Sequence, residues 1–258
     1  MRPMVWLRIV VLLGMLFLIV GGGTTAAQTP PGGENDGEAV YPVRQNDGAI
    51  RPADAPAACT RIGFNNSLNG WTVHNGEWYT GTDYIYTYGS VTETVSISYD
   101  MDLTRTDFQA RMLRRGCNDC SAGIVIRGNP EPLFNRGTWD TMYGLYYRAN
   151  GKCAVVRTFY YGGTHWIGAF LYLTDCPSIV QGEAWNTLRA VADGNQLSFY
   201  INDQLIWSGQ DPYNANPHGR VGIVMRRSED PSVQDELRVE WASLCWPYAA
   251  FLPVVARR

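Results

Sequence analysis

Two stretches of the sequence combine aromatic rings with planar polar groups. The first is Phe159–Trp166, "FYYGGTHW", in which a Gly-Gly pair separates two tyrosines from a histidine and a tryptophan. The second is Arg127–Tyr143, "RGNPEPLFNRGTWDTMY", which contains arginine, asparagine, tryptophan and aspartate. Rings of this kind stack on the apolar C–H face of a sugar, while planar polar groups hydrogen-bond its hydroxyls. Both stretches therefore indicate ligand-binding loops, although the same rings also serve to pack loops onto the edge of a β-sandwich.

Further aromatic residues lie in Asn186–Gly209, which predicts three strands joined by two turns. A two-residue turn at Asn202-Asp203 would pair Ser198 with Trp207. One face of the strands then carries Phe199, Ile201 and Ile206, and the other carries Tyr200, Leu205 and Trp207. The second face is either covered by a loop or forms an exposed aromatic platform. The predicted ligand-binding residues are Arg127, Asn129, Trp139, Tyr160, Tyr161, His165, Trp166, Tyr200 and Trp207.

The acidic residues do not point to hydrolysis. Glycoside hydrolysis uses two carboxyl groups beside the scissile bond, about 5 to 9.5 Å apart. Glu93 stands alone in its stretch, and Asp100 and Asp102 lie at a strand end beside a turn. Glu236 and Glu240 alternate with apolar residues, as in an ordinary half-solvated strand. The sequence has no G-x-S-x-G elbow, no P-loop and no histidine spacing typical of zinc. We therefore predict no catalytic residue, with glycoside hydrolysis as the alternative.

The sequence gives little support for cofactor binding or for nucleic-acid binding. Removing Arg2 and Arg8 with a leader leaves 24 acidic residues and a net charge of −5, which opposes nucleic-acid binding. Calcium takes oxygen ligands, and the turns carry Asp193, Asn195, Asp203 and Asp211. Turns favour these residue types anyway, so we predict no cofactor, leave calcium open and name no metal ligand.

The ends of the chain differ from its middle. Residues 1–27 have a basic start, a short apolar run and a small-residue exit, which predicts a secretory signal peptide or, as the alternative, an uncleaved anchor. Residues 28–56 are rich in Pro, Gly, Asp and Glu and predict a flexible linker. Residues 57–246 predict one domain, and residues 247–258 form an apolar tail too short to span a membrane. We therefore expect a secreted or cell-surface protein without a membrane span after cleavage. Its oligomeric state stays open.

The middle region predicts an all-β domain, because turn residues recur between short aromatic and β-branched runs. Asn150-Gly151 is typical of a type I′ hairpin turn. The expected strands are Val91–Tyr99, Phe108–Arg114, Ala122–Arg127, Met142–Arg148, Cys153–Tyr160, Trp166–Leu173, Leu188–Ala192, Gln196–Ile201, Gln204–Ser208, Arg220–Arg226 and Glu236–Trp241.

All six cysteines lie in the exported part, and an even number behind a signal peptide implies disulfides. Six cysteines allow many connectivities, which the sequence alone does not decide. Our preferred pairing is Cys59–Cys245, Cys117–Cys120 and Cys153–Cys176. A redox or metal role for Cys117-x-x-Cys120 lacks both the second cysteine pair and the βαβ context that it would need.

Five segments resemble one superfamily in their order along the chain. They are "AGIVIRGN" (122–129), "YGLYYRANGKCAVVR" (143–157), "NTLRAVADGNQLSFYINDQLI" (186–206), "GRVGIVM" (219–225) and "ELRVEWASL" (236–244). The pattern resembles the concanavalin A-like lectin/glucanase superfamily, in particular the laminin G-like jelly rolls and the 3-keto-disaccharide hydrolase type of domain. The resemblance implies a jelly-roll sandwich of two antiparallel sheets whose concave face often binds carbohydrate. Some members bind calcium, and others hydrolyse glycosides with an E-x-D-x-x-E strand that this sequence lacks.

The sequence thus predicts a secreted, lectin-like protein that binds a carbohydrate or cell-surface glycan without chemistry. A glycoside hydrolase of the 3-keto-disaccharide type and a laminin G-like protein-adhesion module are the alternatives.

Overall fold

The structure is a computed structural model that describes residues 58–246, apart from residues 65, 91, 92, 162, 229 and 231. The expected signal peptide, linker and apolar tail lie outside the described residues. Within the described part, strands dominate and the helical element is the single 3₁₀ turn η1, Asn135–Gly137. No helix of this part is long and apolar enough to cross a membrane. The predicted all-β fold is confirmed.

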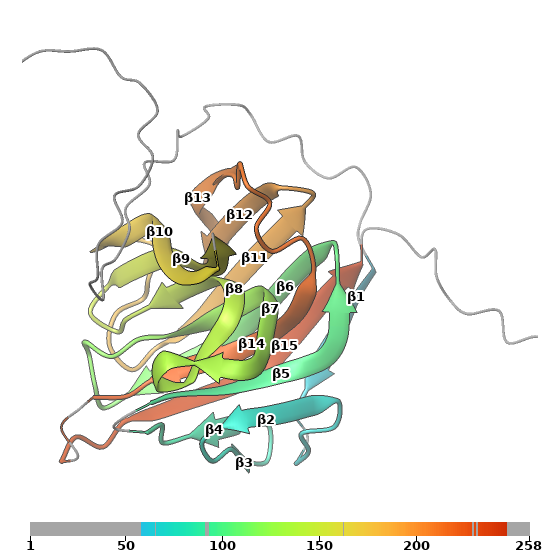
Figure 1. Ribbon diagram of the computed structural model, residues 1–258. Coiled ribbons are helices and arrows are strands. Elements are labelled where there is room, and N and C mark those ends of the chain that lie inside the picture. The colour runs from blue at the N-terminus through green and yellow to red at the C-terminus, as the bar shows by residue number, and fades with distance from the viewer. Residues whose placement is uncertain are drawn as a thin grey trace, which may run out of the picture. The chain divides into compact units, whose positions relative to one another are not determined.

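The strands form two antiparallel sheets, which together make a jelly-roll sandwich (Figure 1). The eight-stranded sheet has the order β13-β12-β11-β6-β15-β4-β3, with β1 also paired with β15. Its strands are β1 (Ala58–Gly63), β3 (Tyr79–Thr80), β4 (Ile85–Thr87), β6 (Thr106–Arg115), β11 (Trp185–Asp193), β12 (Gln196–Ile201), β13 (Gln204–Gln210) and β15 (Glu236–Trp246). The seven-stranded sheet has the order β10-β9-β8-β7-β14-β5-β2. Its strands are β2 (Trp71–Asn75), β5 (Thr94–Leu103), β7 (Ala122–Phe134), β8 (Thr138–Tyr147), β9 (Lys152–Tyr161), β10 (Thr164–Asp175) and β14 (Gly219–Arg226).

The hydrophobic core between the sheets follows from residue alternation along the strands. In β6, Phe108, Ala110 and Met112 are fully buried, while the residues between them reach the outer face. In β14 of the other sheet, Ile223 and Met225 are likewise fully buried in the main core. Successive side chains of a strand point to opposite faces, so each strand contributes one apolar row to the sandwich. Burying one large aliphatic or aromatic side chain contributes about 1.5–3 kcal/mol.

The predicted strands all overlap observed ones, and β12 has the predicted bounds. The strands β1 to β4 are missing from the prediction, because they are short and lie among Gly, Asn and Thr residues that resemble loops. The stretch Arg127–Tyr143, expected to be a loop, is instead the far end of the β7–β8 hairpin.

The two hairpin turns with predicted geometry behave differently. Asn202 and Asp203 both have positive φ, 49° and 63°, so the two-residue turn between β12 and β13 is confirmed. At the β8–β9 hairpin only Gly151 has positive φ, 87°, and the Arg148 amide donates to the Lys152 carbonyl. The hairpin is confirmed there, but the type I′ turn is wrong, because a longer loop needs positive φ at its last residue only.

The predicted face of Trp207 is wrong. Phe199 pairs with Trp207 and Tyr200 pairs with Leu205, so Ile206 is an extra residue in β13. Such a bulge reverses the side-chain alternation beyond it. Trp207 therefore turns into the core, where its ring stacks on Phe170 at a centroid distance of 4.7 Å.

All three disulfides form in the predicted pairing. Cys59–Cys245 joins the directly paired strands β1 and β15 across 186 residues of chain. Cys153–Cys176 links the start of β9 to the residue after β10, and Cys117–Cys120 closes a short loop between β6 and β7.

Candidate functional site

The β7–β8 hairpin covers part of the outer face of the seven-stranded sheet. Figure 1 shows both strands curving in front of β14 and β5. At the hairpin tip, a Cβ on Gly137 would lie only 2.5 Å from the carbonyl oxygen of Thr94 in β5. The tip therefore rests directly on the backbone of β5, across the width of β14.

Trp139 fixes this hairpin on the sheet. Its buried ring packs with Val125, Met142 and Val224, which form a small apolar cluster separate from the main core. The ring lies so close to Gly222 that an added Cβ there would be 2.5 Å from it. Side chains larger than hydrogen do not fit beneath the indole, so Gly222 makes room for Trp139 on this face.

The open part of this face carries a cluster of polar and aromatic groups. The Tyr160 hydroxyl donates a 2.7 Å hydrogen bond to Oδ1 of Asp140, and Nε2 of His165 is hydrogen-bonded to the Asp140 carbonyl oxygen. The His165 ring stacks on Phe134 at 3.6 Å and lies 5.2 Å from the Tyr160 ring. Asp140 is buried, whereas 54% of the Tyr160 surface is exposed. We call Tyr160, Asp140, His165 and Phe134 the hairpin cluster, because it joins β7–β8 to β9–β10.

The protonation of Tyr160 and the hydrogen bonding of His165 follow from the contacts within the hairpin cluster. The hydrogen bond to Asp140 raises the pKa of Tyr160, because it stabilises the protonated phenol. The buried Nδ1 of His165 has no hydrogen-bond partner within the described protein. The cluster therefore presents a neutral, oriented phenol ring at the surface, while the unpartnered His165 nitrogen lies buried beneath it.

The hairpin cluster brings together only some of the predicted residues. Tyr160 and His165 lie in it, and Trp166, half-buried, follows His165 in β10. Asn129 is exposed, and its Oδ1 accepts the Glu131 amide. Tyr161 ends β9, and its side chain is outside the description.

The other predicted residues lie away from an open surface or on the other sheet. Arg127 is buried, and its guanidinium donates to the carbonyl oxygens of Thr104 and Gly194. Trp139 and Trp207 have no ring face free for a ligand, since one seals the hairpin and the other fills the core. Tyr200 lies in the eight-stranded sheet, 5.4 Å below the Arg189 guanidinium. Tyr200 therefore lies on a different sheet from Trp166 and Trp139, and the three rings do not line one groove.

A second polar group on the same sheet was missed by the sequence analysis. Nε2 of His74 is 2.7 Å from the Ser98 hydroxyl, and its Nδ1 is 3.5 Å from Glu131. Arg220 Nη1 lies 3.8 Å from Asp100 and 3.7 Å from Glu131. These residues come from β2, β5, β7 and β14, so only the sheet order brings them together. Burial lowers the pKa of His74, and the nearby Arg220 adds to that effect, whereas Glu131 and Asp100 oppose it.

A row of tyrosines on the other sheet was also missed. Tyr86 lies between the buried Ile85 and Thr87 in β4, and Tyr84 and Tyr88 flank this strand. The alternation of "YIYTY" was a readable signal for one aromatic face, but the strand is too short to stand out.

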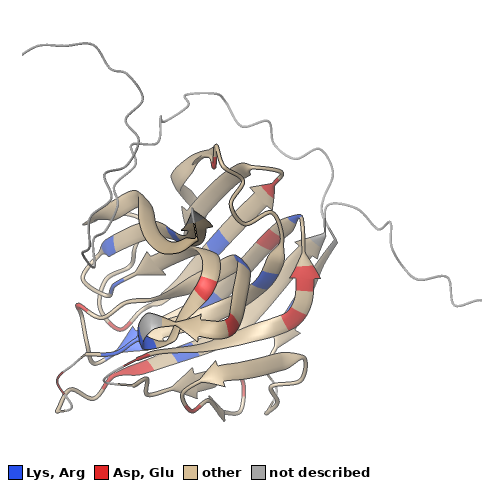
Figure 2. Ribbon diagram, viewed as in Figure 1, with Lys and Arg blue, Asp and Glu red and all other residues tan. Residues whose placement is uncertain are grey.

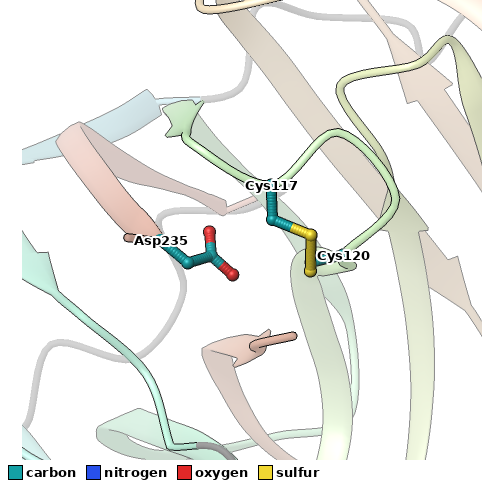
Figure 3. A group of neighbouring side chains, drawn as sticks. All are labelled: Cys117, Cys120 and Asp235. Carbon is teal, nitrogen blue, oxygen red and sulfur yellow. A yellow bond between two sulfur atoms is a disulfide. The ribbon is translucent and has the colours of Figure 1, made fainter. Parts of the chain in front are cut away.

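The structure gives no support to a metal site at the cysteines. In the described part of the chain, the one group of candidate ligands that lies close together is Cys117, Cys120 and Asp235 (Figure 3). The cysteines form a disulfide and offer no thiolate, and Asp235 is paired with Arg114. Two of the acidic turn residues are also occupied. Both oxygens of Asp193 accept from Arg105, and those of Asp211 accept from Tyr143 and Arg157. Calcium binding therefore stays the open alternative of the sequence-based prediction.

Acidic and basic side chains are interspersed along the strands (Figure 2). On the outer face of the eight-stranded sheet, Arg189 pairs with Asp107 at 2.6 Å and Arg111 pairs with Glu240 at 2.9 Å. This face therefore has no field of a single sign to attract a highly charged partner.

No protein-family model matches the chain, and the comparison with curated proteins found no match. Several solved structures do match. A native glycosidic hydrolase is 11% identical, with a TM-score of 0.53 over 75% of this chain and 97% of that one. The GlcNAcα1-4Gal-releasing endo-β-galactosidase of Clostridium perfringens is 9% identical, with a TM-score of 0.52 over 79% of this chain and 66% of that one. The β-glucanase of Bacillus licheniformis is 10% identical, with a TM-score of 0.50 over 72% and 97%. At such identities the likeness concerns the fold, and the chain has the predicted concanavalin A-like jelly roll.

Proposed function

We propose that this protein binds glycans outside the cell without changing them chemically, and that the hairpin cluster is the binding site. The observation that carries this proposal is Tyr160, a residue that is 54% exposed while its hydroxyl is held by the buried Asp140. A ring already fixed in one orientation loses little conformational freedom when a ligand stacks on it. Beside it, the half-buried Phe134 ring adds apolar surface and is held by stacking on the nearly buried His165 ring.

The fold and the cysteines support this proposal. The three solved structures that share the jelly roll are named for action on glycosides, so the scaffold suits carbohydrate ligands. Fold alone does not fix function, which depends on the site. Three disulfides in a domain of this size favour an oxidising, extracellular compartment.

A glycan array with the disulfide-bonded protein tests the proposal. We expect retention of one class of glycan and a loss of affinity on the order of tenfold in Tyr160→Ala, since one stacked ring contributes about that much. Tyr213→Ala is the matched control, because Tyr213 is 56% exposed but lies outside the hairpin cluster. Equal binding by wild type and Tyr160→Ala would remove the cluster from the site. Retention of extracellular proteins, with no retained glycan, would favour the laminin G-like adhesion module.

One observation favours hydrolysis as a second candidate. Asp100 and Glu131 both lie within 4 Å of the same Arg220 nitrogen, so their oxygens are less than about 8 Å apart. This upper limit overlaps the span used by paired glycosidase carboxyls, about 5 to 9.5 Å. Both side chains are exposed to solvent on the outer face of the seven-stranded sheet.

Product analysis with ordinary and 3-keto disaccharides tests this candidate. Turnover that disappears in Glu131→Gln and persists in Glu93→Gln would establish it, because Glu93 is exposed and accepts a hydrogen bond from Asn75, away from Arg220. Release of no sugar from either substrate class by the wild type would reject it.

A further inference from the structure

Four tyrosines form a continuous strip at the edge of the eight-stranded sheet, in which Tyr79 and Tyr88 are exposed and Tyr84 and Tyr86 are half-buried. Tyr79 in β3 stacks on Tyr86 in β4 at a centroid distance of 5.2 Å. Tyr84 and Tyr88 lie 5.8 and 5.6 Å from Tyr86, one on each side of it. Exposure reaches 52% at Tyr88. We call these four residues the tyrosine strip.

The core does not require these rings. Ile85 and Thr87, which alternate with them, are fully buried and attach β4 to the sandwich. β4 pairs with β15 through Ile85, Tyr86 and Thr87. β3 ends the strand order, so no further strand of the described sheet lies beyond the strip. Since folding does not demand four neighbouring rings at a solvent-facing edge, such a surface indicates binding.

The tyrosine strip leads into a pocket of about 620 Å³. Tyr88 forms part of the pocket wall, together with Arg115, Glu183, Arg227, Glu236 and Arg238. Arg238 connects the two features, because its guanidinium lies 4.9 Å over the Tyr84 ring while it also lines the pocket. The tyrosine strip and the pocket are therefore parts of one continuous surface.

The charges of the pocket favour a neutral ligand. Arg238 makes a two-point contact with Glu236 at 2.9 and 3.1 Å, and Arg115 lies 3.1 Å from Glu183. Arg227 and Asp235 also line the pocket, so three guanidinium groups face three carboxylates and the pocket attracts neither a polyanion nor a polycation. Paired Arg and Glu side chains still offer donors and acceptors in fixed positions, as sugar hydroxyls need.

We propose that the tyrosine strip and its pocket form a second binding site, for a neutral polysaccharide chain. The rings lie between 5 and 6 Å from Tyr86 at different tilts, so they offer ring faces and ring edges to a chain of sugars, and the pocket takes the end or a branch of the chain. This site belongs to the eight-stranded sheet, whereas the hairpin cluster belongs to the seven-stranded sheet. The inference shares only the class of ligand with the proposed function and does not need the hairpin cluster. Two sites on one domain would raise the avidity for a polymer above that of either site.

The test is co-sedimentation with insoluble cellulose, β-glucan, chitin and xylan, followed by titration with soluble oligosaccharides of the retained polymer. Four forms are compared with wild type: Tyr86→Ala/Tyr88→Ala, Tyr88→Phe, Tyr160→Ala and the control Tyr213→Ala. We expect the double variant to lose affinity for the retained polymer on the order of tenfold, and Tyr88→Phe to keep it because the ring remains. An unchanged melting temperature shows that the double variant is folded.

The outcomes separate this site from the hairpin cluster. Loss in Tyr86→Ala/Tyr88→Ala with binding retained in Tyr160→Ala supports the tyrosine strip and counts against the hairpin cluster. Unchanged polymer binding by the folded double variant overturns the proposal for the tyrosine strip, regardless of how strongly Tyr160→Ala binds. Retention of none of the four polymers by wild type also overturns it, while a glycan array still tests the hairpin cluster. If the double variant unfolds, Glu183→Gln combined with Tyr88→Ala replaces it, and unchanged binding there again overturns the proposal.

Discussion

The Tyr160 hydroxyl donates a 2.7 Å hydrogen bond to Asp140 and thereby links the β9–β10 hairpin to the β7–β8 hairpin. Asp140 is buried and Tyr160 is half exposed, so one residue acts as the anchor and the other as the surface. The raised pKa of the Tyr160 phenol keeps it protonated at physiological pH, and it can donate this bond throughout that range.

Removing the anchor should weaken glycan binding without removing the ring. In Asp140→Ala, Tyr160 becomes free to rotate, and a ligand must then restrict it on binding. We expect a loss of affinity of about two- to tenfold, the usual effect of one hydrogen bond. Titration calorimetry on Asp140→Ala, Tyr160→Phe and the double variant checks this. Additive losses would show that the two residues act independently.

Trp139 should stabilise the fold by holding the hairpin on the sheet. Trp139→Ala is expected to cost about 3–5 kcal/mol in urea unfolding, because it leaves a cavity under the hairpin. Gly128→Ala should also destabilise, by about 1–3 kcal/mol, since its Cβ would lie 2.2 Å from the indole.

The control is the combination of the two changes. If the indole is the obstacle, Gly128→Ala should cost clearly less in a Trp139→Leu background than in wild type. The same cost in both backgrounds would mean that Gly128 is needed for its backbone and not for Trp139.

The buried role of Trp139 explains why the sequence predicted the sheet better than the site. Alternation defined β6 and β12, because each strand faces a core on one side. Whether an aromatic residue of a hairpin is exposed depends on how the hairpin bends over its own sheet, and local sequence does not record that. Trp207 shows the same limit on a smaller scale, since one bulged residue at Ile206 reverses its face.

The approach of distant residues was equally invisible in the sequence. His74, Asp100, Glu131 and Arg220 meet only because β2, β5, β7 and β14 lie beside or near each other. Pair spacing along the chain carries no trace of such a group. By contrast, the cysteine pairing was open to prediction, since the first and last cysteines tie the two ends of the domain together.

His74 should make stability depend on pH. Its pKa in the folded protein is lowered from 6.5, chiefly by burial, so the fold favours the neutral ring. Above about pH 6.5 neither state binds the proton and the stability is complete. As the pH falls through 6.5 toward the lowered folded value, the unfolded chain takes up the proton first, and stability is lost.

Urea unfolding at several pH values between 7.5 and 5 checks this dependence. The groups that face His74 are Ser98, Glu131, Arg220 and Asp100, and His74→Gln leaves all of them in place. We expect the variant to lose less stability on acidification than wild type does. Equal slopes for the two proteins would assign the pH dependence to other groups.

The last prediction concerns Arg114, a charged residue at a core-facing position of β6. It is fully buried, donates to the equally buried Asp235, and reaches the Ser121 carbonyl at 3.1 Å. Asp235 lies beside the Cys117–Cys120 disulfide (Figure 3). Burial raises the pKa of Asp235 despite the pull of Arg114, and burial lowers the pKa of Arg114. Desolvation thus outweighs attraction for both partners, as is common for buried ion pairs.

Removing one partner of the pair should therefore lower the free energy of unfolding strongly, whereas replacing both partners together by apolar residues should not. Asp235→Ala strands the Arg114 charge and should cost about 3–5 kcal/mol. The double variant Arg114→Met/Asp235→Leu removes both charges and should recover most of that loss, since well-packed apolar groups often replace a buried ion pair without cost. Urea unfolding of the two variants decides the matter. A double variant as unstable as Asp235→Ala would show that the hydrogen bonds from Arg114 to the Ser121 and Arg226 carbonyls, and not the stranded charge, hold this end of the sandwich together.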